Sequence, residues 1–179
     1  MWKYFLFPAI FLLYNQIYSV EGERVVKFLS SNCTFNEKYF KNFSITIVEN
    51  LMNMDMYLNR PIQRGFKCKM DIQLRLANAK HFQSVFNQKS DVCALTSSVK
   101  NSMIKSWFKD MTKHSNFMYN CPVEVGHYYL HNWKMGSSMI HKFLIPGSYR
   151  GDIHFFYGKY GTKSHEETLS VTIDALLSN

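Results

Sequence analysis

The chain has 179 residues and a formal net charge of +8; 46% of its residues are hydrophobic and 16% aromatic, whereas only four are proline and eight glycine. This composition excludes a disordered secreted peptide, because disordered chains lack the apolar side chains needed for a core. The length suits one domain, and the basic residues are spread without a run of four or more, so we expect them mostly on solvated faces.

The first 22 residues are predicted to be a secretory signal peptide. Lys3 is the only charged residue before Glu21, and the segment from Tyr4 to Tyr14 is almost wholly apolar. A short positive region, an apolar stretch and small residues near a cleavage point at 19–22 are typical of such signals, whereas a membrane anchor needs about 20 apolar residues. We therefore predict a secreted, extracellular protein in which residues 23–179 form one domain, with no nucleic-acid partner.

Four cysteines lie in the predicted mature chain: Cys33, Cys68, Cys93 and Cys121. An even number of cysteines in an oxidising compartment predicts disulfides. Their spacing matches no zinc site, so we expect no bound metal. Three pairings are open, and the residues alone do not choose among them.

Two sequons, at Asn32 and Asn42, predict N-glycans. The first sequon contains Cys33, so a disulfide formed early at this cysteine would hinder glycosylation of Asn32.

Alternation of apolar and polar residues predicts most of the elements. The expected strands are, in chain order, 43–47, 52–58, 66–76, 125–133, 149–155 and 169–173, with a turn at Glu49–Asn50 and a hairpin loop at 158–162. The clearest strand is 66–76, whose even positions are apolar and whose odd positions are polar, which places Cys68 on the buried face. Several short strands joined by short turns indicate an antiparallel sandwich or barrel.

One segment has helical spacing instead. Val99, Met103, Trp107 and Met111 recur at the helical period, which predicts an amphipathic helix of about four turns. This helix either lies across the sandwich with Trp107 in a filled core or covers a ligand cavity, and both interpretations stay open.

Catalytic motifs are absent from the sequence. It contains no Gly-x-Ser-x-Gly elbow, no His-Glu-x-x-His pair and no phosphate-binding glycine loop. We therefore expect neither an enzyme nor a cofactor.

A set of short motifs between residues 91 and 149 resembles a known family. The motifs are Asp91-Val92-Cys93, a helical stretch, Ser115-Asn116, Cys121-Pro122 and Leu144-Ile145-Pro146-Gly147-x-Tyr149. In this order they resemble the insect secreted family catalogued as domain of unknown function 1091, whose first cysteine is similar to Cys33. One departure is that Gly147 directly follows Pro146, where many relatives insert a residue.

The resemblance implies a fold and a function. The family is related to the taste-associated CheB proteins and is similar to the MD-2-related lipid-recognition (ML) group. It therefore implies a mostly β fold, an immunoglobulin-like antiparallel β-sandwich (ML-like) with one amphipathic helix, whose sheets splay apart around a lipid or other hydrophobic ligand. It also implies a role in contact chemosensation.

For the disulfides, we predict that Cys93 pairs with Cys121 and Cys33 with Cys68. Cys93 precedes the helix and Cys121 follows it, so this bond would clamp the helical excursion to the sandwich.

The leading functional expectation is a secreted binding protein for a small hydrophobic ligand. The residues expected to line its cavity are Met70, Ile72, Leu74, Trp107, Phe108, Tyr128, Leu130, Phe143 and Phe155. One alternative is a cationic defence or surface-binding protein that contacts a membrane surface or receptor through Lys100, Lys105, Lys109 and Lys113. Another is an interaction module with a filled core and no ligand. The ligand and the oligomeric state are left open.

Overall fold

The computed structural model describes residues 24–99, 105–117, 121–135 and 144–178. The predicted signal peptide lies outside these residues, as does Phe143 of the expected ligand site.

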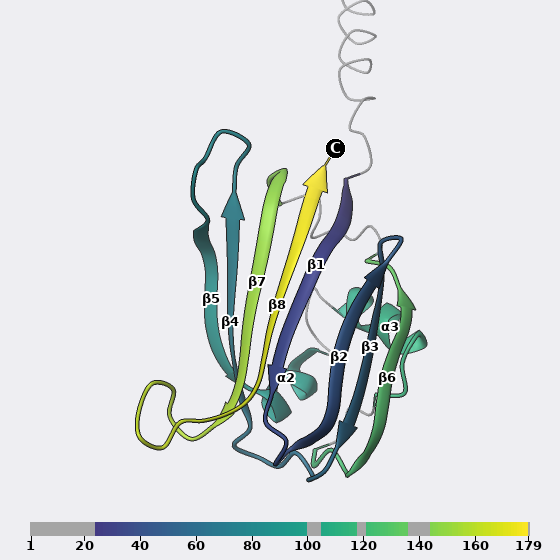
Figure 1. Cartoon of the computed structure of the whole chain (residues 1–179), viewed down its shortest axis with the longest axis vertical. Coiled ribbons are helices and arrows are strands. Elements are labelled where there is room, and N and C mark those ends of the chain that lie inside the picture. Colours follow the sequence, from purple (N-terminus) through teal and green to yellow (C-terminus); the bar gives the residue numbers. More distant parts are fainter. Residues whose placement is uncertain (1–23, 100–104, 118–120, 136–143, 179) are drawn as a thin grey trace, which may run out of the picture.

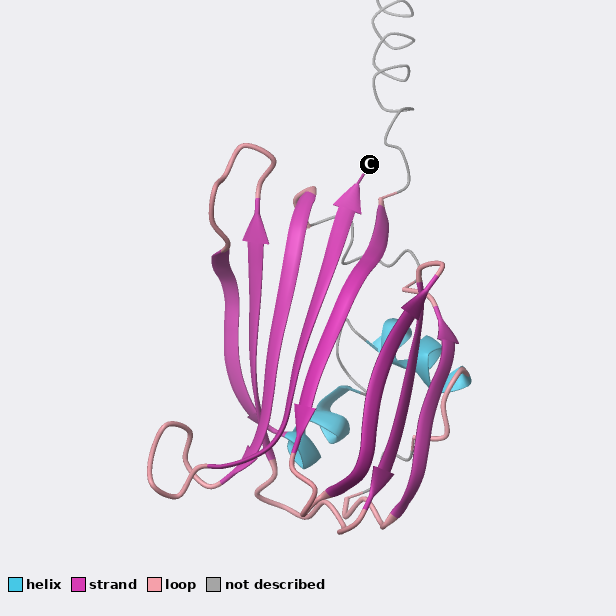
Figure 2. Ribbon diagram, in the orientation of Figure 1, coloured by secondary structure: helices cyan, strands magenta, loops and turns pink. Residues whose placement is uncertain are grey.

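The described residues form two antiparallel sheets (Figure 1). The larger sheet contains, from edge to edge, β1 (Val25–Phe35), β8 (Glu166–Ser178), β7 (Gly147–Tyr157), β4 (Lys67–Arg75) and β5 (Gln83–Asp91). The smaller sheet contains β2 (Phe40–Val48), β3 (Leu51–Leu58) and β6 (Gly126–Trp133). The mostly β, antiparallel, sandwich-like prediction is confirmed, and every predicted strand is present (Figure 2).

Buried side chains hold the two sheets together in two clusters. In the first, Phe40 and Leu58 of the small sheet pack with Leu169 of β8. In the second, Phe28 of β1 packs with Leu130 and Trp133 of β6. The sheets therefore meet mainly through β1 and β8, and Ser31 Oγ on β1 donates a hydrogen bond to the Ile45 carbonyl on β2 (3.0 Å).

The turn predicted at Glu49–Asn50 is confirmed. Both residues have positive φ, 51° and 65°, as the primed turns of two-residue hairpins require. Asn50 also ties this turn to β1, because its side chain accepts a hydrogen bond from the Phe28 N–H (2.7 Å) and donates one to the Val26 carbonyl (3.2 Å).

Two strands were not predicted, β1 and β5. In β1 the register shifts between Phe28 and Ser30, so the alternation changes phase within the strand. In β5 the first seven residues are exposed, because this edge strand buries neither face. Neither strand therefore has the period-two pattern on which the prediction depended.

Two helices occupy the region where one was expected, α2 (Val92–Val99) and α3 (Lys105–Lys113); residues 100–104 lie between the described parts. Helical structure starts earlier than predicted because Asp91 caps α2, its carboxylate accepting the Ala94 N–H (3.0 Å). Of the predicted apolar stripe only Val99, the last residue of α2, lies in this helix, so the pattern located mainly the later part.

One of the two predicted disulfides is confirmed and the other is wrong. Cys93 and Cys121 are bonded, with 5.7 Å between their Cα atoms, whereas Cys33 and Cys68 are free thiols. Cys33 lies on β1 and Cys68 on β4, three strand spacings apart in one sheet, or roughly 14 Å. Bonded cysteines need Cα atoms within about 7 Å. Burial raises the pKa of the Cys68 thiol, which keeps it protonated.

Alkylation of the unfolded, unreduced protein should label two cysteines per chain, Cys33 and Cys68, and leave Cys93 and Cys121 unlabelled until a reductant is added. Peptide mapping by mass spectrometry checks this assignment. A peptide pair linking Cys33 to Cys68 would contradict the strand order given above, and one linking Cys33 to Cys93 or Cys121 would contradict the Cys93–Cys121 bond.

Gly147, where β7 begins, packs closely against β4. A Cβ atom at this position would lie 2.7 Å from Leu74 Cδ1 and 3.0 Å from the Arg75 carbonyl oxygen. We expect Gly147→Ala to lower the free energy of unfolding by about 1–3 kcal/mol, measured by urea denaturation. Gly126→Ala is the matched control, since its nearest neighbour, Tyr128 Cε2, is 3.8 Å away. Equal losses in the two variants would show that the close approach is not the cause.

Candidate functional site

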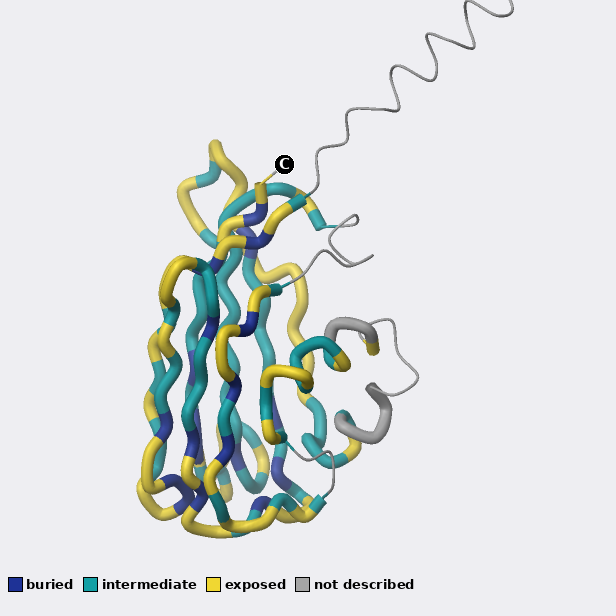
Figure 3. Tube along the Cα trace, turned by 90° about the vertical axis from the view of Figure 1, so that its right-hand side faces the viewer, coloured by how far each residue is buried: buried dark blue, intermediate teal, exposed yellow. Residues whose placement is uncertain are grey.

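Along the row of paired residues that contains Val171, the inner face of the large sheet becomes less buried with distance from the small sheet. Val171 on β8 is 4% exposed and belongs to the first core cluster. Its partner across the sheet is Ile153 on β7, which in turn faces Met70 on β4. Ile153 and Met70 are half-buried, and Gln88, the next partner on β5, is exposed. In this row, therefore, β8 is buried but β7 and β4 are only half-buried, whereas Cys68 and Leu74 elsewhere on β4 are buried. Figure 3 shows how buried, half-buried and exposed residues are distributed along the chain.

The adjacent row on this face contains a gap. Ile173 faces Gly151, and Gly151 faces Ile72, so the middle position has no side chain. A Cβ at Gly151 would meet Ile72 Cδ1 at 3.4 Å, an ordinary contact distance. The row ends on β5 at Phe86, whose exposed fraction is 46%. We define the candidate site as this apolar inner face, carried by Met70, Ile72, Gly151 and Ile153.

The helical segment, which contains α2 and α3, connects two edge strands, β5 of the large sheet and β6 of the small sheet. The other two edge strands, β1 and β2, contact each other. α2 follows β5 directly, and the chain after α3 leads to β6. After α3, the His114 carbonyl accepts the His131 N–H (2.8 Å), which pairs this stretch with the free edge of β6. Met111 of α3 packs against the second core cluster. The helical segment therefore spans the open side of the sandwich, and the Cys93–Cys121 bond closes it into a loop.

The residues expected to line a cavity fall into three groups. Met70, Ile72 and Leu74 lie in a row on the inner face of β4, although Leu74 is only 8% exposed. Tyr128 and Leu130 belong to the two core clusters that join the sheets. Phe155 packs beside the first cluster and stacks on Phe66, with ring centroids 5.7 Å apart.

The third group comes from the helical segment and the chain beyond it. Trp107 lies in α3, but its side chain is not among those described, and Phe143 lies outside the described residues altogether. Phe108 in α3 is half-buried. Sequence reasoning missed Ile153 and Gly151, because a glycine carries no hydrophobic signal and β7 is only weakly alternating.

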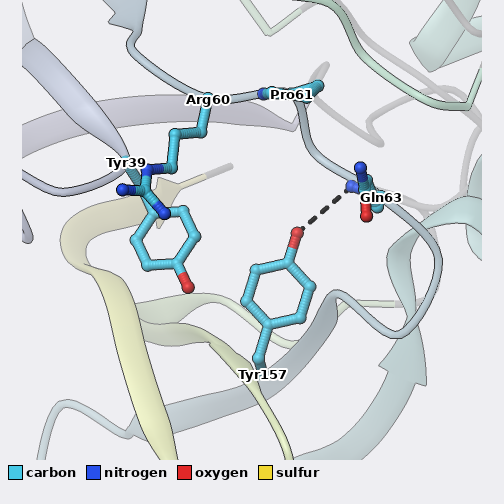
Figure 4. A pocket seen from close by; sticks show the side chains of 5 residues that line it. All are labelled: Tyr39, Arg60, Pro61, Gln63 and Tyr157. Atoms are coloured by element: carbon cyan, nitrogen blue, oxygen red, sulfur yellow. Dashed lines mark hydrogen bonds between the residues drawn. The ribbon is translucent and has the colours of Figure 1, made fainter.

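A separate surface pocket of about 500 Å³ lies at the end of the sandwich where β7 ends. It is lined by Tyr39, Arg60, Pro61, Gln63 and Tyr157 (Figure 4). The Tyr39 and Tyr157 rings are stacked at 5.5 Å, and the Gln63 N–H donates to Tyr157 Oη (3.1 Å). None of the expected ligand residues lines this open, partly polar pocket, so it is distinct from the candidate site.

The lysines considered for surface binding lie on α3 where they are described. Lys105, Lys109 and Lys113 are exposed, and Lys113 is 3.6 Å from the Asp110 carboxylate. Lys100 lies outside the described residues.

Across the described parts of the chain, no group of three or more His, Cys, Asp or Glu side chains is placed to hold a metal ion. In those same parts, no helix is long and apolar enough to cross a membrane.

The motif residues that carry the family resemblance have structural roles here. Asp91 caps α2 and also accepts the Gly65 N–H (3.1 Å). Asn116 joins the segment after α3 to β6, donating to the His127 carbonyl (2.8 Å) and accepting the Tyr129 N–H (2.7 Å). Tyr149 Oη donates to the Ile145 carbonyl (2.7 Å), and burial raises the pKa of this phenol, so it stays neutral.

Residues 68–151 match the model of a family described as protein of unknown function (DUF1091). The match runs from β4 into β7 and includes every motif position discussed above. It supports the resemblance inferred from those motifs. No curated protein matches the chain.

Proposed function

We propose that this protein binds a small hydrophobic ligand, a lipid or hydrocarbon, between its two sheets and beneath the helical segment. The observation that carries the proposal is the half-buried inner face formed by Met70, Ile72 and Ile153, which belongs to neither core cluster. An apolar surface of this kind is stabilised when a ligand removes it from water, by roughly 25 cal/mol per Å² before the costs of binding.

The residues present suit an adaptable apolar site. Gly151 places no side chain of its own between Ile72 and Ile173, and Met70 has a flexible side chain that can follow the shape of different ligands. A site of this kind would favour long, flexible apolar molecules over one rigid shape. In this proposal the sandwich is immunoglobulin-like and of the MD-2-related type, and the relation to CheB proteins suggests a role in contact chemosensation.

Secretion is part of the same proposal. The predicted signal peptide at residues 1–22, the Cys93–Cys121 disulfide and the exposed sequon residues Asn32 and Asn42 support an extracellular location. Since Cys33 is a free thiol, no disulfide at this residue hinders glycosylation of Asn32.

Native mass spectrometry of the secreted, deglycosylated protein tests whether a ligand is present. The expected result is a non-covalent mass of lipid size that is released on unfolding.

A plugged variant separates a ligand site from a filled core. Gly151→Leu projects a side chain from the middle of the inner face, between Ile72 and Ile173. If this region holds ligand, the free energy of unfolding should change by less than about 1 kcal/mol while uptake of the fluorescent probe N-phenyl-1-naphthylamine falls about tenfold. Ser148→Leu, on the opposite face of the same strand, is the matched control and should leave uptake unchanged.

A filled core gives the opposite result. The wild type would then take up no probe, and Gly151→Leu would lower the free energy of unfolding by about 1–3 kcal/mol or more, because the added side chain overpacks the interior. That combination would reject the carrier proposal in favour of an interaction module.

A further inference from the structure

Exposed apolar side chains gather at one end of the sandwich. At this end, which we call the upper end, β1 and β7 begin and β4 and β8 end (Figure 1). The large hydrophobic residues exposed here include Val25 (42%), Leu76 (48%), Ile145 (57%) and Leu176 (36%). Isolated exposed hydrophobic residues are normal on soluble proteins, but a group of them marks an interaction surface.

Ile145 is held outward by its own loop. Arg24 donates a hydrogen bond to the Leu144 carbonyl (2.7 Å), and Tyr149 Oη donates one to the Ile145 carbonyl (2.7 Å). On the other side of the loop, Gly147 packs closely on β4. These contacts fix the loop backbone, so the most exposed isoleucine of the upper end is presented to solvent by an ordered segment.

Basic residues surround this apolar group. On the outer face of the large sheet, Lys27 pairs with Leu176, and Leu176 with Ser148, which faces Arg75. Lys80, in the β4–β5 loop, is also exposed. The nearest carboxylate on this face, Asp174, is paired with Arg150 at 2.8 Å.

The opposite end has a different character. It exposes three carboxylates, Glu37, Glu124 and Glu167, interspersed with the basic residues Lys38, Arg60, Arg64, Lys159 and Lys163. It also exposes the apolar Val125 (50%). The upper end also exposes Glu49, in the turn that Asn50 ties to β1. Lys27, Arg75 and Lys80 outnumber this carboxylate, so the upper end combines apolar side chains with a mainly positive charge.

We propose that the upper end docks on an anionic lipid bilayer. Val25, Ile145 and Leu176 would enter the boundary between headgroups and acyl chains, while Lys27 and Arg75 would contact the lipid phosphates. The positive rim favours this occupant over an apolar protein surface or a second copy of the chain, which carries the same positive charge. The inference does not rest on the proposed ligand site, because docking needs no ligand between the sheets.

Vesicle co-sedimentation of the secreted protein tests the proposal. The vesicles are phosphatidylcholine alone or with about 30 mol% phosphatidylserine, at about 0.1 M salt. We expect binding to the anionic vesicles, weakened about fivefold by Lys27→Ala and about tenfold by Ile145→Asp. Raising the salt to about 0.5 M should weaken the binding without abolishing it, because screening acts on the charges and not on apolar insertion.

Val25→Glu and Val125→Glu form the matched pair, since both change an exposed valine near the start of a strand, at opposite ends of the sandwich. Val25→Glu should weaken vesicle binding and Val125→Glu should not, with unchanged circular dichroism in both.

No binding by the wild type, or equal losses in the pair, would overturn the proposal. So would a wild-type dimer in sedimentation velocity that Ile145→Asp dissociates, which would assign the upper end to self-association. Uptake of N-phenyl-1-naphthylamine by a protein that does not bind vesicles would reject the docking proposal and leave the ligand-site proposal standing.

Discussion

Three neighbouring strands span roughly 10 Å and five span roughly 19 Å, so the smaller sheet of this sandwich can cover only part of the larger one. The covered part is β1 and β8, where Phe28, Leu169 and Val171 are buried against the small sheet. On β4 and β7, Met70, Ile72 and Ile153 are only half-buried and need another cover. The helical segment from β5 to β6 lies on that side, and its ends are fixed by the Asp91 cap, the Cys93–Cys121 bond and the pairing of His114 with β6. The half-buried face and the helical segment that covers it thus both follow from the difference in width between the two sheets.

Local patterns in the sequence predicted the parts of the fold that bury one face. The even positions of β4 are apolar and point inward, and Phe66, Cys68 and Leu74 are buried as expected. The β2–β3 hairpin was predicted for the same reason. β5 was missed because an exposed edge strand has no buried face, and the Cys33–Cys68 bond was wrongly predicted because strand order is a long-range property. Nothing in the chain near Cys33 shows that β8 and β7 lie between it and Cys68.

The candidate site was predicted only in part, and the reason is also physical. Met70 and Ile72 were identified from alternation, and the structure places Ile153 beside them through strand pairing. Tyr128 and Leu130 have the same hydrophobic character but lie on β6 of the small sheet itself, where they join the core between the sheets. Hydrophobicity alone does not distinguish a side chain that holds sheets together from one left uncovered between them. The matched family motifs do not help, since Asp91, Asn116 and Tyr149 stabilise turns, caps and edges.

The strand order also determines when the large sheet can form. Val25, the first residue of β1, pairs with Ser178, the last residue of β8. A chain that emerges N-terminus first therefore holds β1 without its sheet partner until the final 13-residue strand has been made. Pairing between such distant segments is slow, because a long loop must close before any contact forms. Asn32 on β1 pairs with Thr172 of β8, so it too lacks its partner during synthesis. In the secretion that we propose, a glycosylating enzyme would therefore meet this sequon before the sheet can close around it.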